Sequence, residues 1–178
     1  MALKDFKFYK LEQDTEIKPF KCSDEDLNGF LLEDAKNYMM EMLASTYILE
    51  DMQCAKTVAY FSLLNDRISF NAEAMQKTTW NRINRKIPNG KRRGHYPALK
   101  IGRLAVSEEY AGQGIGGDIL EFIKYMIVNE RKYGCRFLTL DAYRSAVPFY
   151  EKCGFKLLSS ADEQELTRSM YFDLKCFE

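Results

Sequence analysis

The fold is decided by residues 99–117, which read LKIGRLAVSEEYAGQGIGG. The apolar first half predicts a strand, and the second half predicts a tight turn that leads into a helix. Four glycines fall within the six residues from Gly112 to Gly117. Glycine lets the backbone adopt positive φ and approach a ligand closely, and the free N–H groups of a helix's first turn favour an anion. The stretch therefore predicts a phosphate cradle made of residues Gly112, Gln113, Gly114, Ile115, Gly116 and Gly117.

The strand before this cradle does not keep a simple alternation. Leu99 and Ile101 are at odd-numbered positions, whereas Leu104 and Val106 are at even-numbered positions, so in a regular strand the two pairs would face opposite sides of the sheet. One extra residue near Gly102-Arg103, a β-bulge, would turn all four inward and leave backbone groups unpaired. A bulged strand that leads to a phosphate cradle suits a long ligand with amides along its length and phosphates at one end. Coenzyme A has that shape.

Three motifs in this order resemble the GNAT superfamily of acetyl-CoA-dependent N-acetyltransferases. They are Leu104-Ala105-Val106, the turn Gly112-Gln113-Gly114-Ile115-Gly116, and residues 149–155, FYEKCGF. The resemblance runs from about Phe20 onward. It implies a single domain over residues 1–178 with an α/β (α+β) GNAT fold, in which a mixed, mostly antiparallel sheet contains a parallel βαβ core and a bulged central strand. Residues 102–106, 22–31 and 59–63 are further similar to the GNAT toxins that acetylate aminoacyl-tRNA.

The resemblance also implies roles for single residues. Acetyl-CoA, with no metal, would contact the cradle, the strand residues Leu104, Ala105 and Val106, and also Ala142, Phe149 and Lys152. Tyr150 would be the catalytic acid, because a phenol with a pKa near ~10 is protonated at neutral pH and can donate to a leaving thiolate. Two positions depart from the family pattern. Ala111 stands where Arg or Gln is usual, and Tyr143 stands where Asn or Asp is usual.

Composition indicates an ordinary globular protein. The chain has 178 residues, 26 basic and 26 acidic side chains, and no apolar run near the ~20 residues of a membrane span. Five widely spaced cysteines with no C-x-x-C predict a reduced, cytoplasmic chain. One histidine makes a zinc site improbable. The resemblance adds a homodimer and, for a toxin, an antitoxin protein as partner.

The charge is unevenly distributed. Between Glu73 and Glu108 there is no acidic residue but there are nine basic ones: Lys77, Arg82, Arg85, Lys86, Lys91, Arg92, Arg93, Lys100 and Arg103. The same region carries the only Trp and the only His. We therefore predict an acceptor surface for a phosphate-rich substrate such as tRNA, formed by Trp80, Lys91, Arg92, Arg93 and Arg103. The alternative is a solvated loop with Trp80 packed inward.

Hydrophobic spacing predicts the remaining elements. Helices are expected over residues 24–44 with Ser23 as N-cap, 78–84, 114–132 and 146–153. Strands are expected over 6–11, 46–50, 57–64, 136–142, 155–158 and 169–176. A turn at Asn65-Asp66 would let 67–71 pair back as a hairpin.

The acceptor amine stays open at this stage. No general base is apparent apart from His95, and an α-amine with a pKa near ~7.7 needs one less than a lysine amine near ~10.4 does. This difference favours aminoacyl-tRNA. The alternatives are a protein, polyamine or small-molecule amine, or a non-catalytic acyl-CoA-binding module.

Overall fold

The described strands form one mixed sheet in the order β1-β2-β3-β4-β5-β7-β6. The computed structural model describes residues 3–71, 75, 77–85, 87–130 and 133–177. The chain divides into two compact units, which we treat in turn: unit 1 is Met1–Leu64 with Ile101–Ile123, and unit 2 is Asn65–Lys100 with Lys124–Glu178. Strands β3 (Lys56–Ser69) and β4 (His95–Val106) and helix α4 (Ile115–Glu130) contribute to both units.

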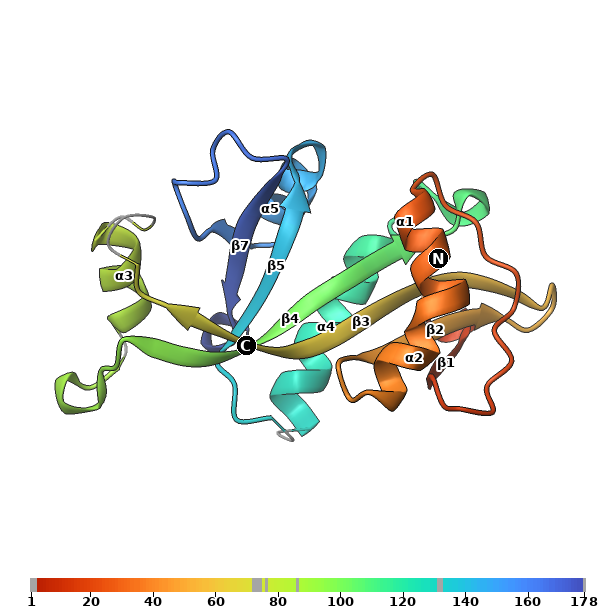
Figure 1. The fold of residues 1–178 in the computed structure, drawn as a ribbon, viewed down its shortest axis with the longest axis horizontal. Coiled ribbons are helices and arrows are strands. Elements are labelled where there is room, and N and C mark those ends of the chain that lie inside the picture. Colours follow the sequence, from red (N-terminus) through yellow and green to blue (C-terminus); the bar gives the residue numbers. More distant parts are fainter. Residues whose placement is uncertain (1–2, 72–74, 76, 86, 131–132, 178) are drawn as a thin grey trace. The chain divides into compact units, whose positions relative to one another are not determined.

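Unit 1 contains the N-terminal strands and one long helical segment (Figure 1). β1 (Lys7–Lys10) pairs antiparallel with β2 (Ser45–Asp51), and β2 pairs antiparallel with β3. The helical segment is α1 (Glu25–Gly29), the π-helix η2 (Phe30–Asp34) and α2 (Ala35–Met40). Its buried residues pack on Ile48, Tyr60 and Ala105 of the strands. Two short 3-10 helices, η1 (Leu3–Asp5) and η4 (Glu108–Tyr110), complete the unit.

Unit 2 contains the parallel strand pair. Ala98–Lys100 of β4 pair in parallel with Phe137–Thr139 of β5 (Phe137–Tyr143), as predicted for a βαβ unit. β5 and β6 (Lys156–Leu157) both pair antiparallel with β7 (Thr167–Asp173). The other elements are α3 (Lys77–Asn84), η3 (Asn89–Lys91), η5 (Arg144–Ala146), α5 (Val147–Lys152) and η6 (Leu174–Cys176). Ile68, Ile83, Tyr96, Phe137 and Tyr171 form part of the core.

The predicted hairpin at Asn65-Asp66 is wrong. β3 is a single strand of 14 residues that runs through this dipeptide to Ser69. Asp66 accepts a hydrogen bond from the Thr139 hydroxyl, and Ile68 is fully buried. Tertiary contacts on both sides of the dipeptide thus override its turn propensity.

Two further predictions need correction. The N-cap of α1 is Asp24 rather than Ser23, because the Asp24 carboxylate accepts from the N–H groups of Asp26 and Leu27. The helical segment also ends at Met40, before the predicted residue 44. The predicted end of α4 at Lys132 lies outside the described residues.

The burial pattern of β4 differs from the predicted one. Ala105 is buried, whereas Leu104 and Val106 are only half-buried, so the inward face keeps one parity from Leu99 through Ile101 to Ala105. Gly102 has its own structural reason. A Cβ there would lie 2.4 Å from Leu64 Cδ2 and 3.3 Å from Ser62 Oγ, so a larger residue at this position would require the Leu64 side chain on β3 to move.

Candidate active site

The glycine-rich turn of unit 1 has the backbone that a phosphate cradle requires. Gly112 and Gly114 have φ of 76° and 83°, in the region that favours glycine. The carbonyl of Gly114 accepts the Asp118 N–H at 3.1 Å, which makes Gly114 the residue at which α4 begins. A Cβ built on Gly112, Gly114 or Gly117 meets nothing within 4 Å. The space in front of this helix N-terminus is therefore open to a ligand.

The side chains of the turn offer no free polar group to a phosphate, so only backbone groups are available. The Gln113 amide donates to the Glu109 carbonyl at 3.4 Å, so it folds back on its own loop. Ala111 is exposed and offers no polar side-chain atom. Ile115 is buried under the turn and anchors the start of α4. The N–H groups of the first helical turn are therefore the groups available to bind an anion, and this role stays a prediction.

Tyr150 lies on α5 in unit 2 with its ring packed among aromatic side chains. It meets Phe149 edge-on at 5.0 Å between ring centroids, and Phe155 edge-on at 5.9 Å. Burial, and to a smaller extent the charge of Cys153, raises the pKa of Tyr150 to about 12. Among the described residues its hydroxyl has no hydrogen-bond partner. The phenol is thus protonated at neutral pH and free to donate to a substrate.

The other residues of unit 2 that are predicted to contact the donor lie on β5 and α5. Ala142 is buried on β5, Phe149 is 38% exposed on α5, and Lys152 is exposed at the end of α5. Gly154 follows with φ of 85° and terminates the helix, as predicted. Tyr143 is half exposed at the end of β5.

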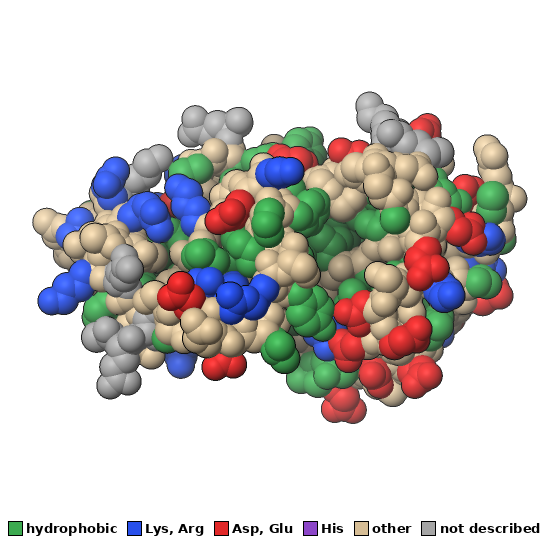
Figure 2. Space-filling view, turned by 90° about the horizontal axis from the view of Figure 1, so that it is seen from above, with side chains coloured by type: hydrophobic (Ala, Val, Ile, Leu, Met, Phe, Trp, Pro, Cys, Tyr) green, Lys and Arg blue, Asp and Glu red, His purple; other side chains and the backbone are tan. Residues whose placement is uncertain are grey.

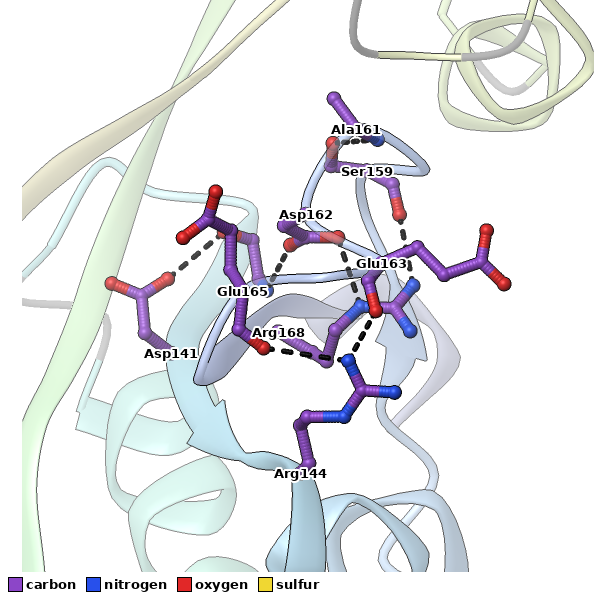
Figure 3. A network of polar contacts seen from close by, with 9 residues as sticks. Asp141, Arg144, Ser159, Ala161, Asp162, Glu163, Glu165 and Arg168 are labelled. Carbon is purple, nitrogen blue, oxygen red and sulfur yellow. Dashed lines mark hydrogen bonds and ion pairs between the residues drawn. The ribbon is translucent and has the colours of Figure 1, made fainter.

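The loop that follows β6 is held by ion pairs and carbonyl contacts (Figure 3). Arg168 pairs with Asp162 at 2.9 Å, and Asp162 also accepts the Ser169 N–H at 2.6 Å. Arg144 donates to the carbonyls of Glu163 and Glu165. These contacts fix the acidic loop against the ends of β5 and β7. Composition predicts an acidic loop there but not this folding.

Six basic residues between Lys77 and Arg93 of unit 2 are all exposed. Figure 2 shows Lys and Arg side chains gathered over the end of unit 2 that carries α3. The cluster, called the basic face below, consists of Lys77, Arg82, Arg85, Lys91, Arg92 and Arg93, all exposed. In the described part of the chain no acidic side chain forms an ion pair with any of them. Lys86 lies outside the described residues, and Lys100 instead pairs with Asp141.

Two predicted acceptor residues have packing contacts of their own. Trp80 stacks on Tyr96 at 5.6 Å and lies 5.5 Å from Phe70, so its partly buried ring packs against the core of unit 2. Arg103 belongs to unit 1, where its guanidinium lies 5.1 Å from the Phe30 ring centroid and 3.6 Å from the Asp26 carboxylate. Neither residue is part of the basic face, and their contact with a substrate stays a prediction.

Comparison with known protein families agrees with this geometry. Residues 82–157, which include the cradle, α4 and α5, match the family model described as an acetyltransferase (GNAT) domain. Over these residues the chain is similar to a GNAT acetyltransferase domain. The predicted superfamily and the predicted acetyltransferase class are thereby confirmed.

Solved structures extend the GNAT likeness to nearly the whole chain. AtaT complexed with acetyl-methionyl-tRNAfMet is 22% identical, with a TM-score of 0.77 over 97% of this chain and 97% of that one. A tyrosine-to-phenylalanine mutant of the AtaT toxin, bound to the C-terminus of the antitoxin AtaR and acetyl-CoA, is 21% identical, with a TM-score of 0.75 over 98% and 96%. A tyrosine-to-phenylalanine mutant of KacT is 21% identical, with a TM-score of 0.75 over 97% and 96%. The predicted GNAT fold is therefore confirmed.

Three smaller findings complete the description. All five cysteines are free thiols. No helix in the described ranges is both long and apolar enough to cross a bilayer. Within the same ranges, no group of three or more His, Cys, Asp and Glu side chains is arranged to hold a metal ion.

Proposed function

We propose that this acetyltransferase moves the acetyl group of acetyl-CoA directly to the α-amine of aminoacyl-tRNA. Two structures of one comparison protein, AtaT, support the choice of substrates, since one contains acetyl-CoA and the other contains acetyl-methionyl-tRNAfMet. A homodimer, an antitoxin protein as partner and a cytoplasmic location belong to the same proposal. An AtaT structure that contains the C-terminus of AtaR supports the antitoxin.

The donor would be held through its phosphates by the cradle in unit 1. The residues fit this role because Gly112, Gly114 and Gly117 leave open space before the N-terminus of a helix of 16 residues. Backbone N–H groups and the helix dipole favour a pyrophosphate there. The strand residues Leu104, Ala105 and Val106 would supply backbone N–H groups to the amides and to the tetrahedral oxyanion. The thioester supplies the activated acetyl group.

Tyr150 would supply the proton that the departing thiolate requires. When the amine attacks the thioester carbonyl, a C–N bond forms and the C–S bond breaks. The nitrogen releases one proton as it becomes an amide, and a proton returned through solvent restores the phenol of Tyr150. Because its pKa is about 12, Tyr150 keeps its proton at Oη throughout the physiological range and donates it toward the sulfur as negative charge develops. Phe149 and Lys152, on the same short helix, are the proposed donor contacts beside it.

The acceptor amine would react without a dedicated base. An α-amine with a pKa near ~7.7 is partly unprotonated at neutral pH, so that positioning supplies much of the rate enhancement. His95, the candidate base in the sequence, is exposed at the start of β4. An amine that is already deprotonated does not depend on it.

The observation that carries the choice of an RNA acceptor is the basic face. Six exposed cations, which form no ion pair with the acidic side chains that the structure describes, create a local positive potential on a chain whose total charge is zero. A polyanion that binds there releases counterions, and this release makes its affinity steeply dependent on salt. A small-molecule amine would have no use for such a surface.

The test neutralises the three cations at and after η3. Lys91, Arg92 and Arg93 change together to Gln, and binding of charged tRNA is measured by fluorescence anisotropy across a salt series. The slope of log affinity against log salt should become shallower by about 2–3, because up to three phosphate contacts are lost. The matched control changes Lys7, Lys10 and Lys36 of unit 1 to Gln and should leave the slope unchanged. Equal slopes for the wild type and the Lys91, Arg92 and Arg93 variant would refute the role of the basic face.

A further inference from the structure

A buried lysine of α4 lies against the end of the helix that carries Tyr150. Lys124 is only 2% exposed. Its Nζ lies 4.3 Å from the ring centroid of Phe172, 5.7 Å from that of Phe155 and 5.9 Å from that of Phe177. Lysine is rarely buried to this extent, since removal of an ammonium from water is costly. The side chain of Lys124 is thus packed among aromatic rings beside the turn that follows α5.

One polar contact of Lys124 is with the C-terminus of α5. Its Nζ donates a hydrogen bond of 2.7 Å to the carbonyl of Cys153, the residue directly after the helix. The last carbonyls of a helix have no intrahelical donor, and a cation there is favoured by the helix dipole. Lys124 thus satisfies one of these carbonyls and fixes where the helix ends.

The turn that Lys124 contacts is connected to Tyr150 by a backbone hydrogen bond and by a ring contact. The Tyr150 carbonyl accepts the Phe155 N–H at 3.0 Å, and the Phe155 ring packs edge-on against the Tyr150 ring. Between them, Gly154 lies so close to Phe172 that a Cβ would be 3.1 Å from that ring. Lys124 contacts the rings of Phe155 and Phe172 as well as Cys153, so it holds the whole turn that follows α5.

We propose that Lys124 is a positioning residue that holds α5 so that the Tyr150 hydroxyl stays at the leaving sulfur. This inference rests on the proposed role of Tyr150 as the acid. A catalytic group displaced by about 1 Å can lose about 100-fold in rate, so a weakened end of α5 affects kcat rather than donor binding. Phe149 and Lys152 on α5 are proposed donor contacts as well, but the donor phosphates are proposed to bind the cradle of unit 1, so donor affinity should change less than kcat.

The experiment is a double-mutant cycle on the whole chain, with acetyl-CoA and methionyl-tRNA as substrates. Lys124→Met keeps an unbranched apolar chain among the aromatic rings but removes the donor to Cys153. It should lower kcat about 10- to 100-fold and leave the acetyl-CoA dissociation constant within about twofold. In a Tyr150→Phe background the same change should cost less than about threefold, because residues that act as a unit are non-additive.

Two variants separate positioning from stability. Lys124→Gln retains an N–H donor and should keep more of kcat than Lys124→Met. Met126→Ala weakens the same helix at another buried position and should lower the melting temperature without changing kcat.

The outcomes distinguish this inference from the proposed function. Wild-type kcat in Lys124→Met, or an equal loss in the presence and absence of the Tyr150 hydroxyl, would overturn the positioning role alone. Wild-type kcat in Tyr150→Phe would overturn the proposed acid and the positioning role together. If Lys124→Met does not fold, the cycle is run with Lys124→Gln, and additivity with Tyr150→Phe again overturns the inference.

Discussion

A single methyl group added at Gly117 should raise the free energy of unfolding and weaken the binding of acetyl-CoA. Gly117 is in the first turn of α4, has no positive φ, and a Cβ there meets nothing within 4 Å. Gly117→Ala is therefore compatible with the folded chain. In a helix the Cα–Cβ bond tilts toward the N-terminus, which places the new methyl group in the direction from which a phosphate would approach.

The two expected effects have opposite signs. Replacing a helical glycine by alanine stabilises a helix by about 0.5–1 kcal/mol, so the free energy of unfolding should rise. Binding of acetyl-CoA should weaken at least tenfold, which corresponds to about 1.4 kcal/mol, because the methyl group excludes the close approach of the pyrophosphate. If the variant is more stable than the wild type but binds acetyl-CoA more weakly, misfolding cannot explain the loss of affinity.

The assay combines urea unfolding with calorimetric titration of acetyl-CoA. Gly29→Ala is the matched control, since Gly29 is also helical and a Cβ there also meets nothing within 4 Å. It should raise stability to a similar extent and leave acetyl-CoA affinity unchanged. Wild-type affinity in Gly117→Ala would refute the assignment of the cradle to the donor phosphates.

Two further predictions concern the stability of unit 2. The pKa of Tyr150, about 12, lies above the ordinary value of about 10, so its stabilising effect is complete below about pH 10 and is lost as the pH rises toward 12. Between about pH 9 and pH 12, urea unfolding should show a smaller loss of stability for Tyr150→Phe than for the wild type, and equal losses would contradict the raised pKa. Asp173 accepts two hydrogen bonds from Arg136, at 2.9 and 2.7 Å. Both side chains are less than 20% exposed. Asp173→Asn should cost about 2–4 kcal/mol, measured by urea unfolding, whereas Glu109→Gln at an exposed ion pair should cost little.

Short sequence patterns predict much of the local structure of the candidate site in unit 1. The glycines and the apolar spacing that follows them place the cradle and the start of α4 to within a residue, because positive φ and helix initiation depend on nearby residues. The motif around Tyr150 likewise predicts α5 and its glycine terminator. The parallel pairing of β4 and β5 follows from the strand–helix–strand order.

Long-range contacts explain what the sequence does not predict. The Asn65-Asp66 dipeptide has turn propensity, yet it lies inside β3 because Thr139, far along the chain, bonds Asp66. Trp80 falls in a basic segment, but its ring packs with Phe70 and Tyr96. Lys124 shows the same limit, because helical spacing gives no sign that a lysine on α4 binds the carbonyl at the end of α5. Partners of this kind are visible only once the chain is folded.

The most direct test of the account is acetyl transfer in a purified system. The chain is incubated with labelled acetyl-CoA and a pool of charged tRNA, and the aminoacyl nucleosides are analysed by mass spectrometry after nuclease digestion. The account predicts acetyl label on the α-amine of one or more amino acids, with a greatly reduced yield in Tyr150→Phe. Label that appears on a protein or a small amine but on no aminoacyl nucleoside would contradict it.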